Sequence, residues 1–250
     1  MATYVISDIH SHFDVFQTFL DTLSEEDEVI IDGDTIDKGP DGIKVLNYVR
    51  KSESITLVMG NHELMMLDYL EAKRNLETVH FPSPSYFTKR SWLEKKADHW
   101  LQRNYGRYTY ADYAALAVQE QNEIYEYLKS LPVLIHREVN GKKFIIVHAG
   151  LYNYQGKDVY YRDVGDESQK YVWGWEPYQH EKDAIIITGH RIVPYVFYKT
   201  EVESDGSWYD IDMGLAMNSK QSQLAALCLE DLSVTYFPLE NYADFDYRTR

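Results

Sequence analysis

Hydrophobic and β-branched residues recur along the chain in short runs that are typical of buried strands. The clearest runs span residues 4–7, 29–32, 55–59, 144–147 and 185–188. Between the first three runs, residues 13–23 and 41–51 place apolar side chains at the spacing of an amphipathic helix. The first part of the chain therefore predicts a β-α-β-α-β order, in which helices pack on a sheet.

Residues 64–130 follow a different pattern, which is polar, aromatic and mostly helical in spacing. Residues 80–85 contain two prolines and predict a break, and residues 112–129 predict one continuous helix. We expect this block to be a helical cap inserted into a single domain of residues 1–250.

The C-terminal part returns to strand-like alternation. The runs that predict antiparallel strands are residues 208–212, 224–229 and 232–237. Residues 241–250 are polar, and we expect them to form a frayed tail.

Charge and composition narrow the class of protein. The 25 Lys and Arg residues against 40 Asp and Glu residues leave a net charge of −15, which disfavours general binding to nucleic acid or to anionic lipid. The one cysteine, Cys228, excludes an intramolecular disulfide, and its apolar neighbours predict a buried, inert thiol. No signal peptide and no apolar run long enough to span a membrane is evident, so we expect a cytoplasmic protein.

Asp, Asn and His side chains follow five of the predicted strands, in short turns flanked by Gly or Ser. Because the carboxyl ends of strands in α/β folds form the ligand-binding crevice, we expect these turns to converge. The converging residues are Asp8, His10, Asp34, Asn61, His148 and His190.

These six side chains offer oxygen and nitrogen donors and no sulfur, a set that suits Mn²⁺, Fe²⁺ or Zn²⁺. Six ligands exceed the number that one open metal site uses, so two metals that share a carboxylate fit better. Each turn is weak evidence on its own: a histidine after a strand is usually structural, and Asn61 could simply cap a helix. The coincidence of five such turns favours the metal interpretation.

A resemblance to a known family rests on five motifs. They are D-I-H at residues 8–10, G-D-T-I-D-K-G at 33–39, G-N-H-E at 60–63, H-A-G at 148–150 and G-H at 189–190. In order and spacing they resemble the phosphoprotein phosphatase family of metallophosphoesterases. The bacterial and phage branch, with its Ser/Thr phosphatases and symmetrical diadenosine tetraphosphatases, is most similar. Residues 100–106, 127–132 and 211–214 resemble further segments of that branch.

The resemblance implies an α/β fold of the calcineurin-like metallophosphoesterase type, a sandwich of two mixed sheets flanked by helices. It implies a first metal held by Asp8, His10 and Asp34. It implies a second metal held by Asn61, His148 and His190, with Asp34 bridging the two.

The resemblance also assigns the catalytic residues. His62 would be the general acid that protonates the leaving oxygen, and Asp37 would orient it. These roles agree with the chemistry, because metal binding lowers the pKa of water to supply a hydroxide nucleophile and imidazole transfers protons near neutral pH. Two divalent ions, of which manganese is the expected one, would outweigh the charge of the two ligand carboxylates, so the site could hold phosphate.

Phosphate recognition departs from the family pattern. Lys38 stands where the family has Arg, and Ser11 replaces a Gly of the first motif. The family's Trp-x-Arg motif matches residues 172–176, which lack an Arg, so we expect Arg162 to bind phosphate together with Lys38. Arg191 is a weaker candidate, and Glu63 is expected to support the site without binding metal.

Three functions remain open at this point. The first is a Ser/Thr protein phosphatase acting on phosphorylated proteins or small phosphoesters. The second is a diadenosine tetraphosphatase-like nucleotide hydrolase, in which tyrosines of the cap would stack on adenine. The third is a binding module without activity, which the unusual Lys38 motivates.

Overall fold

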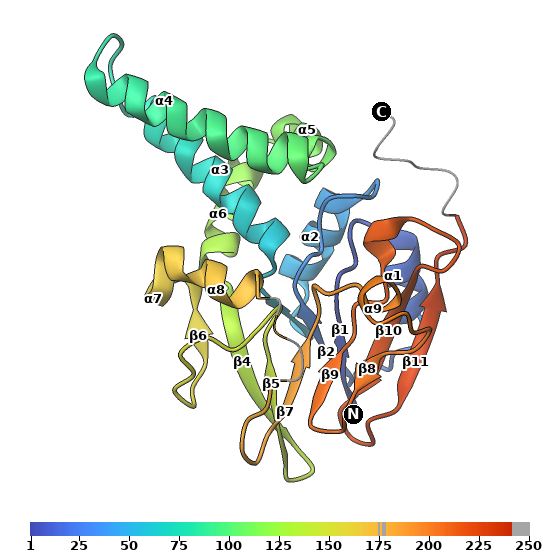
Figure 1. The fold of residues 1–250 in the computed structure, drawn as a ribbon. Helices are drawn as coiled ribbons and strands as arrows, with labels where there is room; N and C mark the ends of the chain where they lie inside the picture. The colour runs from blue at the N-terminus through green and yellow to red at the C-terminus, as the bar shows by residue number, and fades with distance from the viewer. Residues whose placement is uncertain (175, 177–178, 242–250) are drawn as a thin grey trace.

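The protein is described from a computed structural model, which covers residues 1–174, 176 and 179–241. Within these residues the strands form two mixed sheets that face each other (Figure 1). The order in the five-stranded sheet is β11-β10-β1-β2-β3. Its strands are β1 (Thr3–Ile6), β2 (Glu28–Asp32), β3 (Ile55–Val58), β10 (Gln223–Cys228) and β11 (Val234–Pro238).

The six-stranded sheet has the order β6-β4-β5-β7-β9-β8. Its strands are β4 (Pro132–Val139), β5 (Lys142–Ile146), β6 (Val159–Tyr160), β7 (Ile185–Thr188), β8 (Glu203–Ser204) and β9 (Trp208–Asp210). Strands β1, β2 and β3 run parallel to one another, as do β5, β7 and β9. Each sheet therefore brings the carboxyl ends of its parallel strands to a common edge.

Successive side chains of a strand point to opposite faces of its sheet, and this explains how the two sheets pack. Val5 and Ile30 of one sheet share a fully buried cluster with Phe144 and Ile187 of the other, so these side chains fill the space between the sheets. The neighbouring Ile6 points the other way, into a second cluster that the helices cover. The expected sandwich of two mixed sheets flanked by helices is confirmed.

Helices α1 (Phe13–Leu20) and α2 (Gly42–Lys51) cover the outer face of the five-stranded sheet. They were expected to span residues 13–23 and 41–51 and are slightly shorter. Shorter elements complete the described residues: α7 (Tyr161–Val164), η2 (Gly165–Ser168), α8 (Gln169–Val172), α9 (Val193–Val196) and η3 (Leu215–Met217).

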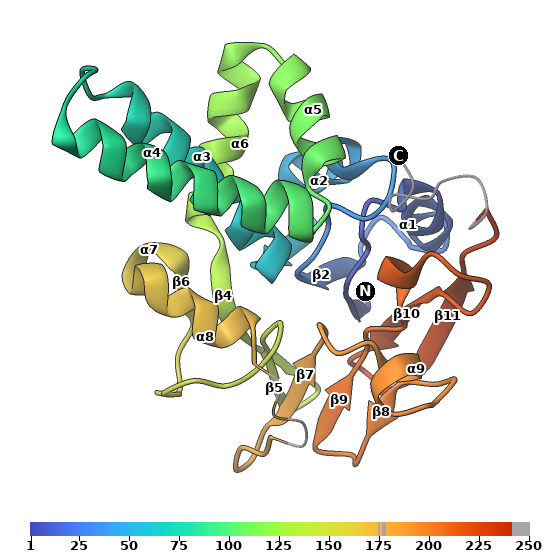
Figure 2. The same ribbon diagram turned by 45° about the horizontal axis from the view of Figure 1, so that its top comes forward.

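The expected helical cap lies over one end of the sandwich. Helices α3 (Asn61–Glu77) and α4 (Pro84–Ala97) form a long hairpin that projects beyond the sheets, as Figures 1 and 2 show. A turn of π-helix, η1 (Asp98–Arg103), leads into α5 (Arg107–Ala115) and α6 (Val118–Ser130). The predicted break falls between α3 and α4, where the Ser83 hydroxyl accepts a hydrogen bond from the Tyr86 N–H and so caps α4.

Three expectations are corrected. The single helix expected over residues 112–129 is two helices, because Leu116 and Ala117 are extended and the Gln121 amide donates to the Leu116 carbonyl across the corner. Strand β9 is antiparallel to β8 but parallel to β7. Cys228 is half-buried and its thiol donates to Glu230, so it is not a core residue.

No helix in the described part of the chain is long and apolar enough to cross a membrane. The expected polar tail lies, apart from Asn241, outside the described residues.

Candidate active site and metal centre

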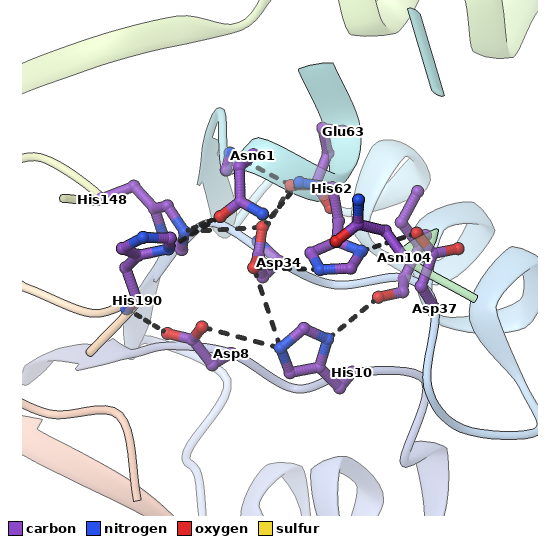
Figure 3. A network of polar contacts seen from close by, with 12 residues as sticks. Asp8, His10, Asp34, Asp37, Asn61, His62, Glu63, Asn104, His148 and His190 are labelled. Carbon is purple, nitrogen blue, oxygen red and sulfur yellow. Dashed lines mark hydrogen bonds and ion pairs between the residues drawn. The ribbon is translucent and has the colours of Figure 1, made fainter. Parts of the chain in front are cut away.

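The six predicted metal ligands meet at the carboxyl edge of the two sheets (Figure 3). The turns after β1 and β2 carry the first part of the set. The turns after β5 and β7 bring the histidines from the other sheet, and the start of α3 brings the amide. Together these elements supply Asp8, His10, Asp34, Asn61, His148 and His190.

The backbone at this edge is unusual. Several residues that are not glycine adopt positive φ angles in the turns that follow the strands. They are Asp8 (52°), His10 (45°), Asp34 (55°), Asp37 (68°), Lys38 (60°) and His190 (68°). L-amino acids rarely adopt these conformations because they cost energy. They persist where the surrounding structure holds them, commonly at functional sites.

Asp34 lies at the centre of the cluster. Its carboxylate oxygens are 3.7 Å from His10 Nε2 and 3.5 Å from His148 Nε2. Asp8 approaches from the other side, with Oδ1 3.7 Å from His10 Nε2. Asp34 thus stands between two sets of donor atoms, the position required of a bridging carboxylate.

Asn61 joins the two histidines of the second set. Its Oδ1 lies 3.0 Å from His148 Nε2 and 2.8 Å from His190 Nδ1 (Figure 3). Asn61 is the first residue of α3, and the cap position is Gly60. The alternative in which Asn61 only caps a helix is therefore wrong, because its side chain points into the cluster.

The histidine rings are oriented by backbone carbonyls. His10 Nδ1 donates to the Ile36 carbonyl at 3.2 Å, and His148 Nδ1 donates to the Asp32 carbonyl at 2.7 Å. Both rings therefore direct Nε2 toward Asp34. This arrangement, in which one ring nitrogen is fixed by a carbonyl and the other faces a carboxylate, is typical of metal-binding histidines.

The charges of this site favour a bound cation. Burial opposes ionisation of Asp34, but the charges of His148 and His62 outweigh it and hold the pKa of Asp34 well below its usual range. Burial also opposes protonation of His148, yet the Asp34 carboxylate keeps the pKa of His148 well above its usual value. In the absence of metal a proton on His148 supplies positive charge beside Asp34.

The other ligands experience the same burial. Burial raises the pKa of Asp8 to about 7 against the opposing charge of His148. Burial and the Lys38 ammonium lower the pKa of His10, and burial with the charge of His148 lowers the pKa of His190 to about 3. Neutral imidazoles beside buried carboxylates are the states that divalent metals bind.

The donor atoms fit divalent metal ions. Ligand atoms of His10, Asp34 and His62 lie within 4.8 Å of one another, as do those of Asp34, His148 and His190. Asp34 belongs to both groups, which agrees with two metals sharing one carboxylate. His62, expected as the acid, lies close enough to join the first group.

His62 is held by a chain of hydrogen bonds that includes the cap. Its Nδ1 contacts Asp37 Oδ2 at 2.6 Å, and the same oxygen accepts from Trp100 Nε1 at 2.8 Å. The other oxygen of Asp37 accepts from the Thr109 hydroxyl at 2.6 Å. Asn104 of the cap lies beside this pair (Figure 3). The sequence predicted Asp37 but not Trp100 or Thr109, although residues 100–106 stood out as a motif.

Glu63 organises the backbone of the site, as expected. Its carboxylate accepts hydrogen bonds from the N–H groups of Asp34 and Thr35 at 2.8 Å and from Gly60 N–H at 3.0 Å. The Thr35 hydroxyl adds a fourth bond at 2.7 Å. Gly60 admits no Cβ, which would lie 2.2 Å from Asp34 Oδ1.

The candidate phosphate ligands fall in different places. Lys38 is half-buried and close enough to the cluster to lower the pKa of His10 after burial. The exposed Arg162 side chain lies 4.0 Å from Asp163 and over the Tyr160 ring. Arg191 is buried in an ion pair with Asp210 (2.9 Å) and is structural.

The Trp-x-Arg match lies partly within the described residues. Trp173 lies against the site, whereas Trp175, which stands at the Arg position, lies outside the described residues.

Comparisons with known proteins agree with this geometry. A family model described as calcineurin-like phosphoesterase matches residues 1–216. A symmetrical bis(5'-nucleosyl)-tetraphosphatase of Glaesserella parasuis serovar 5 is 26% identical over 155 residues, which cover 60% of this chain and 45% of that protein. One of Wigglesworthia glossinidia brevipalpis is 35% identical over 105 residues, 38% of this chain and 39% of that protein. The chain thus matches less than half the length of these relatives.

Two solved structures share the fold over most of the chain. A putative diadenosine tetraphosphatase has a TM-score of 0.54 with 14% identity, covering 96% of this chain and 94% of that one. A Ser/Thr phosphatase from Saccharomyces cerevisiae with similarity to human PP5 has a TM-score of 0.56 with 12% identity, covering 98% and 82%. At these identities the likeness concerns the fold.

Proposed function

Because the chain belongs to the calcineurin-like phosphoesterase family, we propose that it is a two-metal phosphoester hydrolase and that a dinucleoside polyphosphate is its substrate. The observation that carries the hydrolase proposal is the position of Asp34, which lies between two sets of ligand atoms beside the His62–Asp37 pair. The relatives named as symmetrical tetraphosphatases support the substrate.

The metals would be held by two overlapping sets of ligands. Asp8, His10 and Asp34 form the first set. Asn61, His148 and His190 complete the second set with Asp34. Two divalent ions bound there would lower the pKa of water and neutralise charge on the phosphoryl oxygens. Manganese is our first candidate, and Fe²⁺ or Zn²⁺ would accept the same ligands.

The chain's own residues supply proton transfer and orientation. His62 Nε2 lies 3.9 Å from Asp34 Oδ2, so the edge of the ring that faces the metal ligands is available to donate a proton to a leaving oxygen. Asp37 holds Nδ1 of the same ring and fixes its direction. Lys38 would bind a phosphate oxygen as a point charge, where an Arg would bind two oxygens.

The substrate is tested by comparing kcat/KM for diadenosine tetraphosphate with kcat/KM for a phosphoserine peptide, using Mn²⁺-loaded protein. We expect a preference of more than about 100-fold for the dinucleotide. An equal or opposite preference would reject the nucleotide assignment in favour of the Ser/Thr phosphatase expected from the motifs.

The hydrolase proposal has its own control. Metal content measured on the same sample separates an unloaded enzyme from an inactive one. Protein that holds two equivalents of Mn²⁺ and cleaves neither substrate nor an aryl phosphate would be a binding module, and the proposal would be wrong.

A further inference from the structure

Trp173, the tryptophan of the Trp-x-Arg match, lies against the candidate metal site and has no role assigned to it so far. The Trp173 ring meets the His190 ring edge-on, with centroids 5.7 Å apart and an angle of 87°. The His99 ring, from the cap, lies 5.8 Å from Trp173 at an angle of 35°. Trp173 therefore bridges a candidate metal ligand and the cap.

The backbone fixes the position of Trp173. It follows α8, which lies beneath the start of α3 in both views of the ribbon (Figures 1 and 2). The Tyr171 carbonyl accepts hydrogen bonds from the N–H groups of Ala149 (2.9 Å) and Gly150 (3.2 Å), which follow His148 directly. The segment that carries Trp173 is thereby tied to the turn that carries a metal ligand.

Gly174 keeps this contact close. A Cβ at Gly174 would lie 3.1 Å from the Ala149 carbonyl oxygen, so a larger residue would push the two segments apart. The half-buried indole is consequently held in place. A preorganised ring costs less entropy on binding than a mobile one.

Trp173 also lines a groove of about 270 Å³ that begins at Gly150, the end of the metal-ligand turn. Beside the indole the groove presents side-chain amides and one ammonium group. These belong to Gln169, Gln179 and Lys170, and the groove also contains the Glu176 carboxylate. Lys170 Nζ lies 4.0 Å from the centre of the Tyr152 ring and 2.5 Å from its hydroxyl, so a second aromatic ring is present in the same groove.

We propose that Trp173 is the stacking surface for a nucleobase of the substrate, in the groove shared with Gln169, Gln179 and Lys170. The inference rests on the proposed function, since it places a base of the dinucleotide beside the metals. An indole offers a flat apolar face, and amide groups offer both donors and acceptors for a base edge. Lys170 would attract the phosphates that link base and metals.

His99 supports the stacking surface from the cap side. Burial, followed by the charge of Lys96, lowers the pKa of His99, so its ring is neutral near pH 7. A neutral imidazole packs on the indole as an uncharged ring and does not attract the phosphates as an imidazolium cation would.

The test is the variant Trp173→Ala, with Trp173→Phe as the conservative rescue and Trp92→Ala as the matched control. Trp92 lies on α4 of the cap and is 38% exposed. Stacking on an aromatic side chain is worth about 1–3 kcal/mol per base, so Trp173→Ala should raise KM for diadenosine tetraphosphate about 10-fold or more. We expect kcat to change less than twofold, Trp173→Phe to recover most of the affinity, and Trp92→Ala to behave as the parent.

Binding measured without turnover separates this inference from the proposed function. Calorimetric titration of the Mn²⁺-loaded protein with AMP, and in parallel with inorganic phosphate, measures the affinity for each ligand. The difference between the two affinities gives the contribution of the nucleoside apart from that of the phosphate. Trp173→Ala should weaken AMP about 10-fold and leave phosphate within twofold, whether or not the protein hydrolyses any phosphoester.

Three outcomes would overturn the stacking role. Equal loss of AMP and phosphate would mean that Trp173 only supports His190. Unchanged AMP binding would mean that no base stacks there. A larger loss on a phosphotyrosine peptide than on diadenosine tetraphosphate would assign the surface to an aryl phosphate.

Discussion

Thr109 links the cap to Asp37, the partner of the proposed acid His62, and the substitution Thr109→Val tests whether this link supports proton transfer. The Thr109 hydroxyl donates to Asp37 Oδ1 at 2.6 Å and accepts from Asp37 N–H at 3.2 Å. Valine keeps the shape of the side chain, which packs against Gly42, and removes both bonds. In the variant, Asp37 Oδ2 keeps its hydrogen bonds with Trp100 and His62, and Asp37 Oδ1 loses its bond with the Thr109 hydroxyl.

We expect Thr109→Val to lower both the stability of the protein and its rate of catalysis. Removing a buried hydrogen bond to a charged acceptor and leaving one N–H unsatisfied should lower the free energy of unfolding by about 3 kcal/mol. General acid catalysis contributes about 10²–10⁴-fold in rate, and Asp37 keeps two of three side-chain donors. We therefore expect kcat to fall about 10-fold for a substrate with a poor leaving group.

The assay compares two leaving groups on Mn²⁺-loaded protein. An alkyl phosphoester needs a proton on the leaving oxygen, whereas nitrophenolate leaves as a stable anion. Thr109→Val should slow the alkyl substrate about 10-fold and nitrophenyl phosphate less than about twofold. Thr22→Val, which removes a hydroxyl bonded to the Phe19 carbonyl in α1, should leave both rates unchanged. Equal slowing of both substrates would refute the link from Thr109 to proton transfer.

Three further variants or conditions probe the same edge. His62→Asn should reduce kcat about 10²–10⁴-fold for alkyl phosphoesters, and metal analysis should still find two equivalents of Mn²⁺; loss of one equivalent would make His62 a ligand. Glu63→Gln places an NH₂ group against backbone N–H groups that now donate hydrogen bonds to the Glu63 carboxylate. Urea unfolding should therefore show a free energy of unfolding about 2–3 kcal/mol lower, and an unchanged midpoint would contradict this. Saturation with Mn²⁺ at about 100 times Kd should stabilise the protein by about 2.7 kcal/mol for each metal that binds, seen as a rise in Tm that EDTA reverses, whereas an unchanged Tm would speak against a metal site.

The site could be predicted from sequence where its residues follow strands directly. The parallel pairing of β1 with β2 and of β5 with β7 carries Asp8, Asp34, His148 and His190 to one edge, and the family match confirms the resemblance that their motifs predicted. The partners of Asp37 were missed for a physical reason. Trp100 and Thr109 lie 63 and 72 residues away in the chain, and only the folded cap brings them to the site.

The prediction of Arg162 shows a different limit. Residues 159–172 form four short elements, none longer than four residues, so no periodic pattern indicates which way a side chain there points. In the structure the Arg162 guanidinium lies over Tyr160 on the surface. The groove beside Trp173 was missed for the same reason, because it depends on how these short elements pack.

The strands could be predicted where both of their faces are buried and the sequence is a continuous apolar run. Strand β2 is an apolar run and was found, whereas β4 begins at Pro132 and continues into the polar Arg137 and Glu138, so its pattern is weak. The corner between α5 and α6 falls at Leu116 and Ala117, both good helix formers. A local hydrogen bond from the Gln121 side chain to the Leu116 carbonyl spans this corner, and a helical periodicity search does not detect such a contact.

The net charge of −15 acquires a more specific meaning from the buried carboxylates. Besides the expected ligands Asp8 and Asp34, this edge holds the buried carboxylates of Asp32 and Glu63. Glu63 is satisfied by four donors, and burial raises the pKa of Asp32 to about 7 against the charge of His148. Asp34 stays ionised beside a protonated His148, so the charges of this pair balance each other when no metal is bound. Two bound divalent ions would therefore supply the net positive charge that the proposed polyanionic substrate needs at this edge of an acidic protein.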